Sequence, residues 1–220
     1  MLAIRDQLAA LFEKERDIRT LHASLLEHGR AELMTEITLA TTIALALANH
    51  AEATLRLERL ALILGDLDGD DVVDLLVDIL GSHLPEARVS AGEALEALAF
   101  DRFKEVALGI ERALDRLPAS SPALTELPFL LAEVAEPGCT KLLGRFLKHQ
   151  NADVVGAAIE ALAELGDPSA IALLAPLEND RRQVHLDDDS GHGDRVAIGD
   201  LAFEARELLA QIQDRDGGGR

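Results

Sequence analysis

Acidic positions that end Ala- and Leu-rich stretches recur along this sequence at a nearly constant spacing. The four marks, separated by 35, 35 and 31 residues, are Asp66, Asp101, Glu136 and Asp167. Repeats of this length are typical of stacked helix pairs, because one pair cannot bury its own apolar face and neighbouring pairs complete the core. The spacing therefore predicts an all-α protein, an α-solenoid of stacked antiparallel helix pairs.

Two of the repeats align residue by residue. The stretch ARVSAGEALEALAFD (87–101) matches VVGAAIEALAELGD (154–167), which pairs Ala91 with Ala158 and Glu93 with Glu160. The small residues of the second stretch share one helical stripe, where they let helices approach closely. Gly166 then supplies a helix-ending conformation, and Pro168 suits the first position of the next helix because its missing N–H would have no partner there.

The segment NADVVGAAIEALAELGDPSAIALLAPL (151–177) resembles short bacterial HEAT repeats, including those of the phycobilisome-lyase group. The likeness rests on an Asp-led helix, the E-A-L triplet, the L-G-D-P turn and the S-A-I-x-x-L-x-x-L stretch, and it extends over about residues 52–213. It implies a superhelix in which the second helix of each pair lines the concave face. The chain departs from the pattern in several places, including a repeat shorter than the roughly 40–47 residues of the longer HEAT class. Val155 replaces an arginine that is kept as Arg88, and Pro128 is expected to kink or break the helix 121–135.

We expect three parts along the chain. Residues 1–50 form N-terminal helices, one over the first 28 residues and one over about 31–49, which either cap the solenoid or pair with a second copy. Residues 51–213 form the HEAT-like repeat domain, with a loop insertion at about 180–195. Residues 214–220 form a flexible tail. Capping and pairing would bury the same apolar stripe, so the oligomeric state stays open.

The charge balance excludes some classes of partner. Forty acidic and 21 basic residues give a net charge of −19, and no basic run is visible. Phosphate and anionic lipid surfaces both require basic side chains, so we expect neither nucleic acid nor membrane as a partner. A basic protein surface, by contrast, would be attracted. The longest charge-free run near the N-terminus, 37–51, is too short to span a membrane. With a single cysteine, Cys139, the chain fits a cytoplasmic protein.

The stretch GDLDGDDVVD (65–74) resembles part of a calcium-binding loop. Four carboxylates fall at alternating loop positions, as calcium ligands do: Asp66, Asp68, Asp70 and Asp74. The pattern lacks the glycine of position 6, where Asp71 stands, and the carboxylate of position 12, where Val77 stands. The sequence therefore favours an acidic turn in which Gly65 ends one helix and Asp70 or Asp71 caps the next.

The repeat spacing fails near the C-terminal end, where the next helix is delayed by roughly a dozen residues. In repeat proteins such an insertion maps to one face, often the binding face. The inserted stretch holds His185, Asp187, Asp188, Asp189, His192 and Asp194. Histidine and aspartate can bind zinc, but these residues have no fixed helical spacing. We therefore expect a partner-contacting loop, and we predict no metal, no cofactor and no catalytic residue.

These observations favour a non-enzymatic protein-interaction scaffold that binds a partner with a basic surface. The partner would contact the concave face and the 183–195 loop. The candidate contacts are Glu86, Arg88, Glu93, Asp153, Glu160, His185, Asp188 and His192. Two alternatives stay open. One is a bilin lyase or chaperone, implied by the family resemblance alone, and the other is a metal-dependent hydrolase that uses the His/Asp loop.

Overall fold

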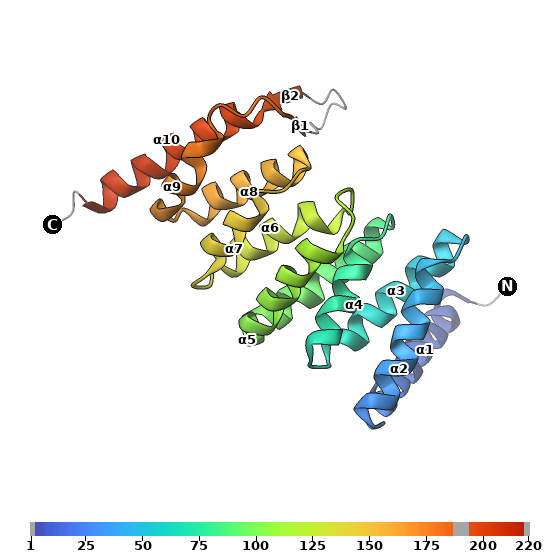
Figure 1. Ribbon diagram of the computed structural model, residues 1–220. Helices are drawn as coiled ribbons and strands as arrows, with labels where there is room; N and C mark the ends of the chain where they lie inside the picture. Colours follow the sequence, from blue (N-terminus) through green and yellow to red (C-terminus); the bar gives the residue numbers. More distant parts are fainter. Residues whose placement is uncertain (1–2, 187–193, 218–220) are drawn as a thin grey trace.

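A computed structural model describes residues 3–186 and 194–217 as an α-solenoid (Figure 1). The N-terminal half contains α1 (Ile4–Leu26), α2 (Arg30–Leu45), α3 (His50–Gly65), α4 (Asp70–Leu80) and α5 (Pro85–Arg116). The C-terminal half contains α6 (Ala123–Val134), α7 (Cys139–Phe146), α8 (Ala152–Leu165), α9 (Ile171–Leu174) and α10 (Ile198–Gly217). Two 3-10 turns, Pro168–Ala170 and Ala175–Leu177, flank α9, and two short strands precede α10. The all-α solenoid class expected from the sequence is confirmed.

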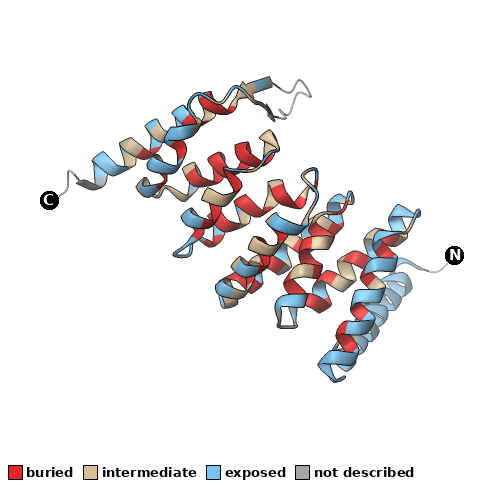
Figure 2. Ribbon diagram, in the orientation of Figure 1, coloured by how far each residue is buried: buried red, intermediate tan, exposed pale blue. Residues whose placement is uncertain are grey.

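The helices form two parallel rows. The inner row consists of α3, the first half of α5 (85–101), α6, α8 and α10, each packed on the next. The outer row consists of α2, α4, the second half of α5 (103–116), α7 and the α9 segment, again in contact from one to the next. Buried residues lie mainly between the rows (Figure 2). The second helix of each pair thus falls in the inner row, as the resemblance implied.

The aligned stretches have equivalent environments. Ala91 and Ala158 are both fully buried, and so are the leucines four residues after each, Leu95 and Leu162. Glu93 and Glu160, two residues after the alanines, are both exposed. The alternation follows from helical periodicity, which turns the small and apolar residues toward the core and the acids toward solvent.

The repeat boundaries differ from each other in structure. Gly166 ends α8 in the left-handed conformation, at φ 68°, as the sequence predicted. The boundary expected at Asp101 is a kink within α5 and not a loop. Only Arg102 departs from helical geometry, with φ −141° and ψ 50°, and the helix continues after it. The expectation for Pro128 is wrong in part: α6 does not end there but continues to Val134. Pro128 and its neighbours Leu127 and Leu131 are buried, so core packing offsets the lost backbone hydrogen bond.

The two ends of the inserted stretch pair with each other as the strands of a β-hairpin. Strand β1 (Gln183–Leu186) pairs antiparallel with β2 (Asp194–Ala197), with Val184 opposite Val196. Val184 is buried against α8 at Gly156, where an added Cβ would lie 2.7 Å from the valine Cγ1. The backbone N–H of His185 donates to Asp153 Oδ1 at 3.1 Å. The hairpin is therefore fixed to the inner row at α8.

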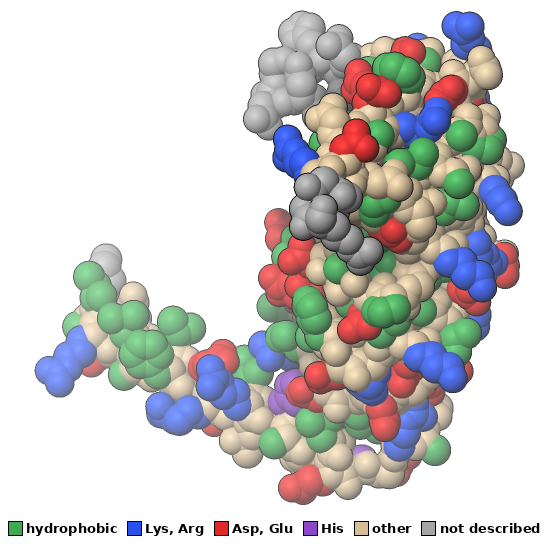
Figure 3. All heavy atoms as spheres, turned by 90° about the vertical axis from the view of Figure 1, so that its left-hand side faces the viewer, with side chains coloured by type: hydrophobic (Ala, Val, Ile, Leu, Met, Phe, Trp, Pro, Cys, Tyr) green, Lys and Arg blue, Asp and Glu red, His purple; other side chains and the backbone are tan. Residues whose placement is uncertain are grey.

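The two ends of the chain differ in how they pack. Helix α1 has no buried residue, is exposed along its length (Figure 2) and projects from the solenoid as an arm (Figure 3). Helix α10 packs on α8 and continues to Gly217, beyond the expected end of the repeat domain at residue 213. Within residues 3–186 and 194–217, no helix is long and apolar enough to cross a membrane.

Candidate functional site: an acidic groove on the inner row

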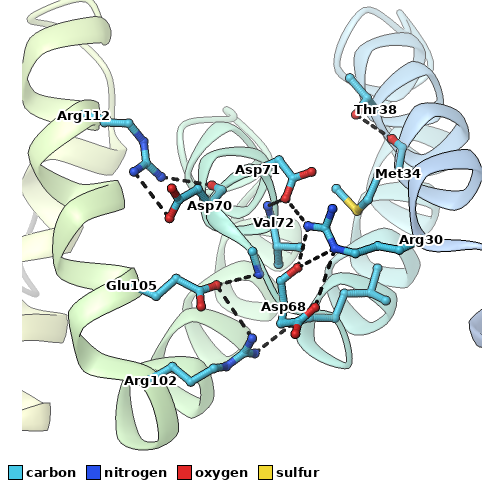
Figure 4. Close-up of polar contacts among 12 residues, drawn as sticks. Arg30, Met34, Thr38, Asp68, Asp70, Asp71, Val72, Arg102, Glu105 and Arg112 are labelled. Atoms are coloured by element: carbon cyan, nitrogen blue, oxygen red, sulfur yellow. Dashed lines mark hydrogen bonds and ion pairs between the residues drawn. The ribbon is translucent and has the colours of Figure 1, made fainter.

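The acidic turn between α3 and α4 is held by arginines (Figure 4). Arg30 of α2 donates to the Asp68 carbonyl oxygen at 2.6 Å and to the Asp71 carboxylate. The N–H of Gly69 donates to Glu105 at 2.7 Å. The expected cap is wrong: Gly69, at φ 114°, is the N-cap of α4, and no side chain caps that helix. The left-handed φ favours glycine here over the aspartates that follow it.

The same pairing continues along the outer row. Arg112 of α5 donates to the Asp74 carboxylate of α4 at 3.1 Å and 3.2 Å, and Arg116 donates to Asp78 at 2.6 Å. Arg145 of α7 lies 3.2 Å from the Asp115 carboxylate, back on α5. Each arginine joins one outer helix to its neighbour. The carboxylates of α4 and the Asp115 carboxylate of α5 thus hold neighbouring outer helices together.

The inner row forms a groove with a different charge balance. It extends from α5 across α6 and α8 to the hairpin, as two adjoining hollows of about 570 Å³ and 430 Å³ that share Phe129. We call this surface the acidic groove. Its charged lining residues are Arg88, Glu96, Glu126, Glu133, Asp153, Glu160, Glu164 and His185. Six carboxylates therefore face one arginine and one histidine.

Apolar side chains form part of the groove. Phe129 of α6 is 39% exposed and Val89 of α5 is 60% exposed, and both line the groove with Ala157 of α8. A large exposed apolar side chain rimmed by polar residues is typical of an interaction site. The groove therefore offers both apolar contact and negative charge.

Four of the groove carboxylates have no ion pair within the described parts of the chain. Arg88 pairs with Glu126, and His185 Nδ1 lies 3.6 Å from Asp153, which leaves Glu96, Glu133, Glu160 and Glu164. Desolvation by the surrounding groups raises the pKa of Glu160, although its side chain still reaches solvent. These four carboxylates thus leave negative charge in the groove that no side chain of residues 3–186 and 194–217 pairs with.

The structure brings together only some of the residues predicted from the sequence. Arg88, Asp153, Glu160 and His185 line the acidic groove. Glu86 is exposed in the first turn of α5 but lies outside the lining. Glu93 instead lines a second groove, which lies at the base of α1. Asp188 and His192 lie outside the described residues.

Sequence reasoning missed the contribution of α6. Glu126, Phe129 and Glu133 follow a three- and four-residue spacing, which places them on one helix face. That spacing was available as a signal, but the break expected at Pro128 divided the helix between Glu126 and Phe129. Because α6 is continuous, all three side chains line the groove.

The described residues support neither a metal site nor a reactive thiol. Among residues 3–186 and 194–217, no three histidine, cysteine or acidic side chains gather in a way that would hold a metal ion. Cys139 is fully buried at the start of α7, and desolvation raises the pKa of its thiol. A buried thiol with a raised pKa is a poor nucleophile, since the thiolate is the reactive form.

Comparisons with known proteins agree with the repeat architecture. Residues 123–185, which include α6, α7, α8 and the start of the hairpin, match the family model described as HEAT repeats. This match confirms the HEAT-repeat resemblance over that part of the chain and places α6 and α8, which form much of the acidic groove, within it. Comparison with curated proteins gave no match.

Among the solved structures that align with most of this chain are three with TM-scores below 0.4. Two are crystal structures of engineered proteins from the Northeast Structural Genomics Consortium. One is 19% identical with a TM-score of 0.38, and the alignment covers 89% of this chain and 97% of the engineered chain. The other is 18% identical with a TM-score of 0.36, covering 86% and 57%. The third is human deoxyhypusine hydroxylase in complex with glycerol, 14% identical with a TM-score of 0.35, covering 94% and 99%.

Proposed function

We propose that this protein is a non-enzymatic scaffold that binds a basic segment of a partner protein in the acidic groove. The observation that carries the proposal is the contrast between the two rows. The outer carboxylates Asp74, Asp78 and Asp115 are paired with arginines from neighbouring helices. The groove residues Glu96, Glu133, Glu160 and Glu164 have no such partner in the described chain. Unpaired charge gathered in a hollow repels itself, and a cationic partner would relieve that repulsion.

The apolar lining narrows the class of partner. Phe129 and Val89 lie among the carboxylates, so a partner that offers lysine or arginine together with large apolar side chains fits best. An amphipathic basic helix has this composition, and such helices bind in grooves through apolar anchors at helical spacing. The charges would set orientation and rate of association, while the apolar contacts would hold the complex.

Titration with a synthetic amphipathic helix of lysines and leucines tests the proposal by calorimetry. We expect binding that weakens as salt is raised, because charge pairs across the groove are screened. The variant Glu133→Lys/Glu160→Lys should weaken binding roughly ten- to a hundredfold, since it replaces attraction with repulsion at two positions.

The matched control is Glu86→Lys/Glu204→Lys, which changes two exposed acidic residues that line neither the acidic groove nor the groove at the base of α1. It makes the same change in net charge on the same row but outside the acidic groove. We expect this control to bind the peptide nearly as well as the unaltered protein. Equal weakening in both variants would show that only the overall charge of −19 attracts the peptide, which would contradict the proposed site.

A further inference from the structure

Helix α1 carries an apolar stripe that stays largely exposed among the residues that the structure describes. Ile4, Leu11, Ile18 and Leu25 recur every seven residues, which keeps them on one side of a helix, and Leu8 and Leu21 flank them. Ile4 is 77% exposed and Leu11 61% exposed, and no residue of α1 is buried. Most helical stability in proteins comes from packing an amphipathic face, so an uncovered stripe of this length indicates a missing partner.

In the described part of the chain, the arm is attached to the solenoid near its C-terminal end. His22 Nε2 lies 2.9 Å from the Asp66 carboxylate, and Leu26 packs against the core. Beside this attachment is a groove of about 770 Å³, which we call the arm groove. Its apolar lining comes from the arm, α2 and α3: Ile18, Leu21, Leu25, Ala40, Leu55, Leu60, Leu62 and Ile63. The stripe on the arm thus continues directly into an apolar groove on the solenoid.

The charge of α1 indicates what kind of partner covers its apolar stripe. Helix α1 has four basic and four acidic side chains, so it is neutral, and the whole net charge of −19 lies in the rest of the chain. Two copies that met through their solenoids would repel each other. Contact through the neutral arms avoids this cost, because the 23-residue helix is about 35 Å long and separates the acidic bodies by several screening lengths.

We propose that the occupant is a second copy of this chain, whose arm lies antiparallel to the first. Superposing the two stripes end to end brings Ile4 of one copy to the level of Leu25 of the other, Leu8 to the level of Leu21, and Leu11 to the level of Ile18. At the centre, Lys14 comes to the level of Glu15. Each distal arm then lies in the partner copy's arm groove, and the interface is the same on both copies, as two-fold symmetry requires.

The antiparallel direction follows from the same charges. A parallel pair would place both acidic solenoids at one end of the arms, where they are closest. It would also leave the distal halves of both arms, which carry Ile4 and Leu8, away from either arm groove. The dimer uses a surface distinct from the acidic groove, and it stands whether or not that groove binds a basic partner.

Light scattering after size exclusion tests the dimer with the full chain. We expect twice the 23.6 kDa of one chain, and a single-chain mass for the variant Leu8→Glu/Leu11→Glu. The control Phe203→Glu/Leu208→Glu adds the same charge at exposed apolar positions of α10 and should stay dimeric. Circular dichroism checks that the arm variant is folded. A single-chain mass for the unaltered protein, or a dimeric arm variant, would overturn the proposal.

Disulfide trapping tests the direction. When the variants Leu11→Cys and Ile18→Cys are mixed, we expect a cross-linked dimer, because the two positions lie at the same level in the antiparallel pair. Leu11→Cys alone should not cross-link, since its two copies would be about 10 Å apart along the axis, beyond the reach of a disulfide. Cys139 is buried and does not compete. Efficient self-linking of Leu11→Cys would mean parallel arms and would overturn the antiparallel arrangement.

Discussion

Acidic side chains have opposite roles in the outer and the inner row. In the outer row, arginines from successive helices neutralise Asp71, Asp74, Asp78 and Asp115, so charge contributes to cohesion between repeats. In the inner row, Glu133 and Glu160 stand beside exposed apolar side chains without a cation from the described chain. The lesson is that net charge alone says little about binding. What matters is which carboxylates the fold leaves unpaired.

The largest expected effect concerns tight packing in the outer row. A Cβ at Gly109 would lie 2.2 Å from Val73 Cγ1 of α4, whereas a Cβ at Gly92, on the inner half of the same helix, would be 3.9 Å from Leu80 Cδ1. Gly109→Ala should lower the free energy of unfolding by about 3 kcal/mol because buried groups would overlap. Gly92→Ala should raise it by about 0.5–1 kcal/mol, through helix propensity. Urea denaturation measures both, and a loss at Gly92 equal to that at Gly109 would contradict the packing difference.

A smaller effect is expected where the last two outer elements meet. Asp167 accepts hydrogen bonds from the Thr140 hydroxyl at 2.5 Å and from the Ser169 N–H at 2.9 Å. Asp167→Ala should lower the free energy of unfolding by about 1–2 kcal/mol, as loss of a helix cap does. Asp167→Asn should lose less, because asparagine also caps helices.

The contribution of Asp167 to the free energy of unfolding should depend on pH. The hydrogen bonds from Thr140 and Ser169 hold the pKa of its carboxyl below the ordinary value. Since the folded pKa is lowered, the stabilisation is present at neutral pH and is lost as the pH falls through that folded pKa. The difference in unfolding free energy between the unaltered protein and Asp167→Ala should therefore shrink in acid. A difference that stays constant with pH would contradict the charge-dependent part of this cap.

The smallest expected effects have opposite signs in the two rows. Asp74→Asn removes half of a partly buried ion pair with Arg112 and should lower the free energy of unfolding by about 0.5–1 kcal/mol. Glu160→Gln should raise it slightly at neutral pH, because the pKa of Glu160 is raised and its charged form is disfavoured in the fold. The comparison of the rows fails if both substitutions destabilise equally, as measured by urea denaturation at neutral pH.

Repeat spacing made most of the architecture predictable. Marks at intervals of 31–35 residues and the stripe around Ala158 report helical periodicity and close packing, which depend on local sequence. The groove was less predictable. Glu86 and Glu93 occupy the expected helix, but membership of the groove depends on how α5 and α6 pack. The break expected at Pro128 hid α6, because a local cost of proline does not reveal that core packing offsets it.

The kink at Arg102 has a mechanical consequence. Elsewhere a loop or turn separates the inner helix of one repeat from the outer helix of the next, but α5 serves as both, bent at a single residue. A single kinked helix, without a loop, therefore connects the inner row to the outer row near the middle of the solenoid. At the other repeat boundaries, a loop in this position could act as a hinge. The two repeats that share α5 should open and close together, so that any flexing of the acidic groove is concentrated nearer its hairpin end.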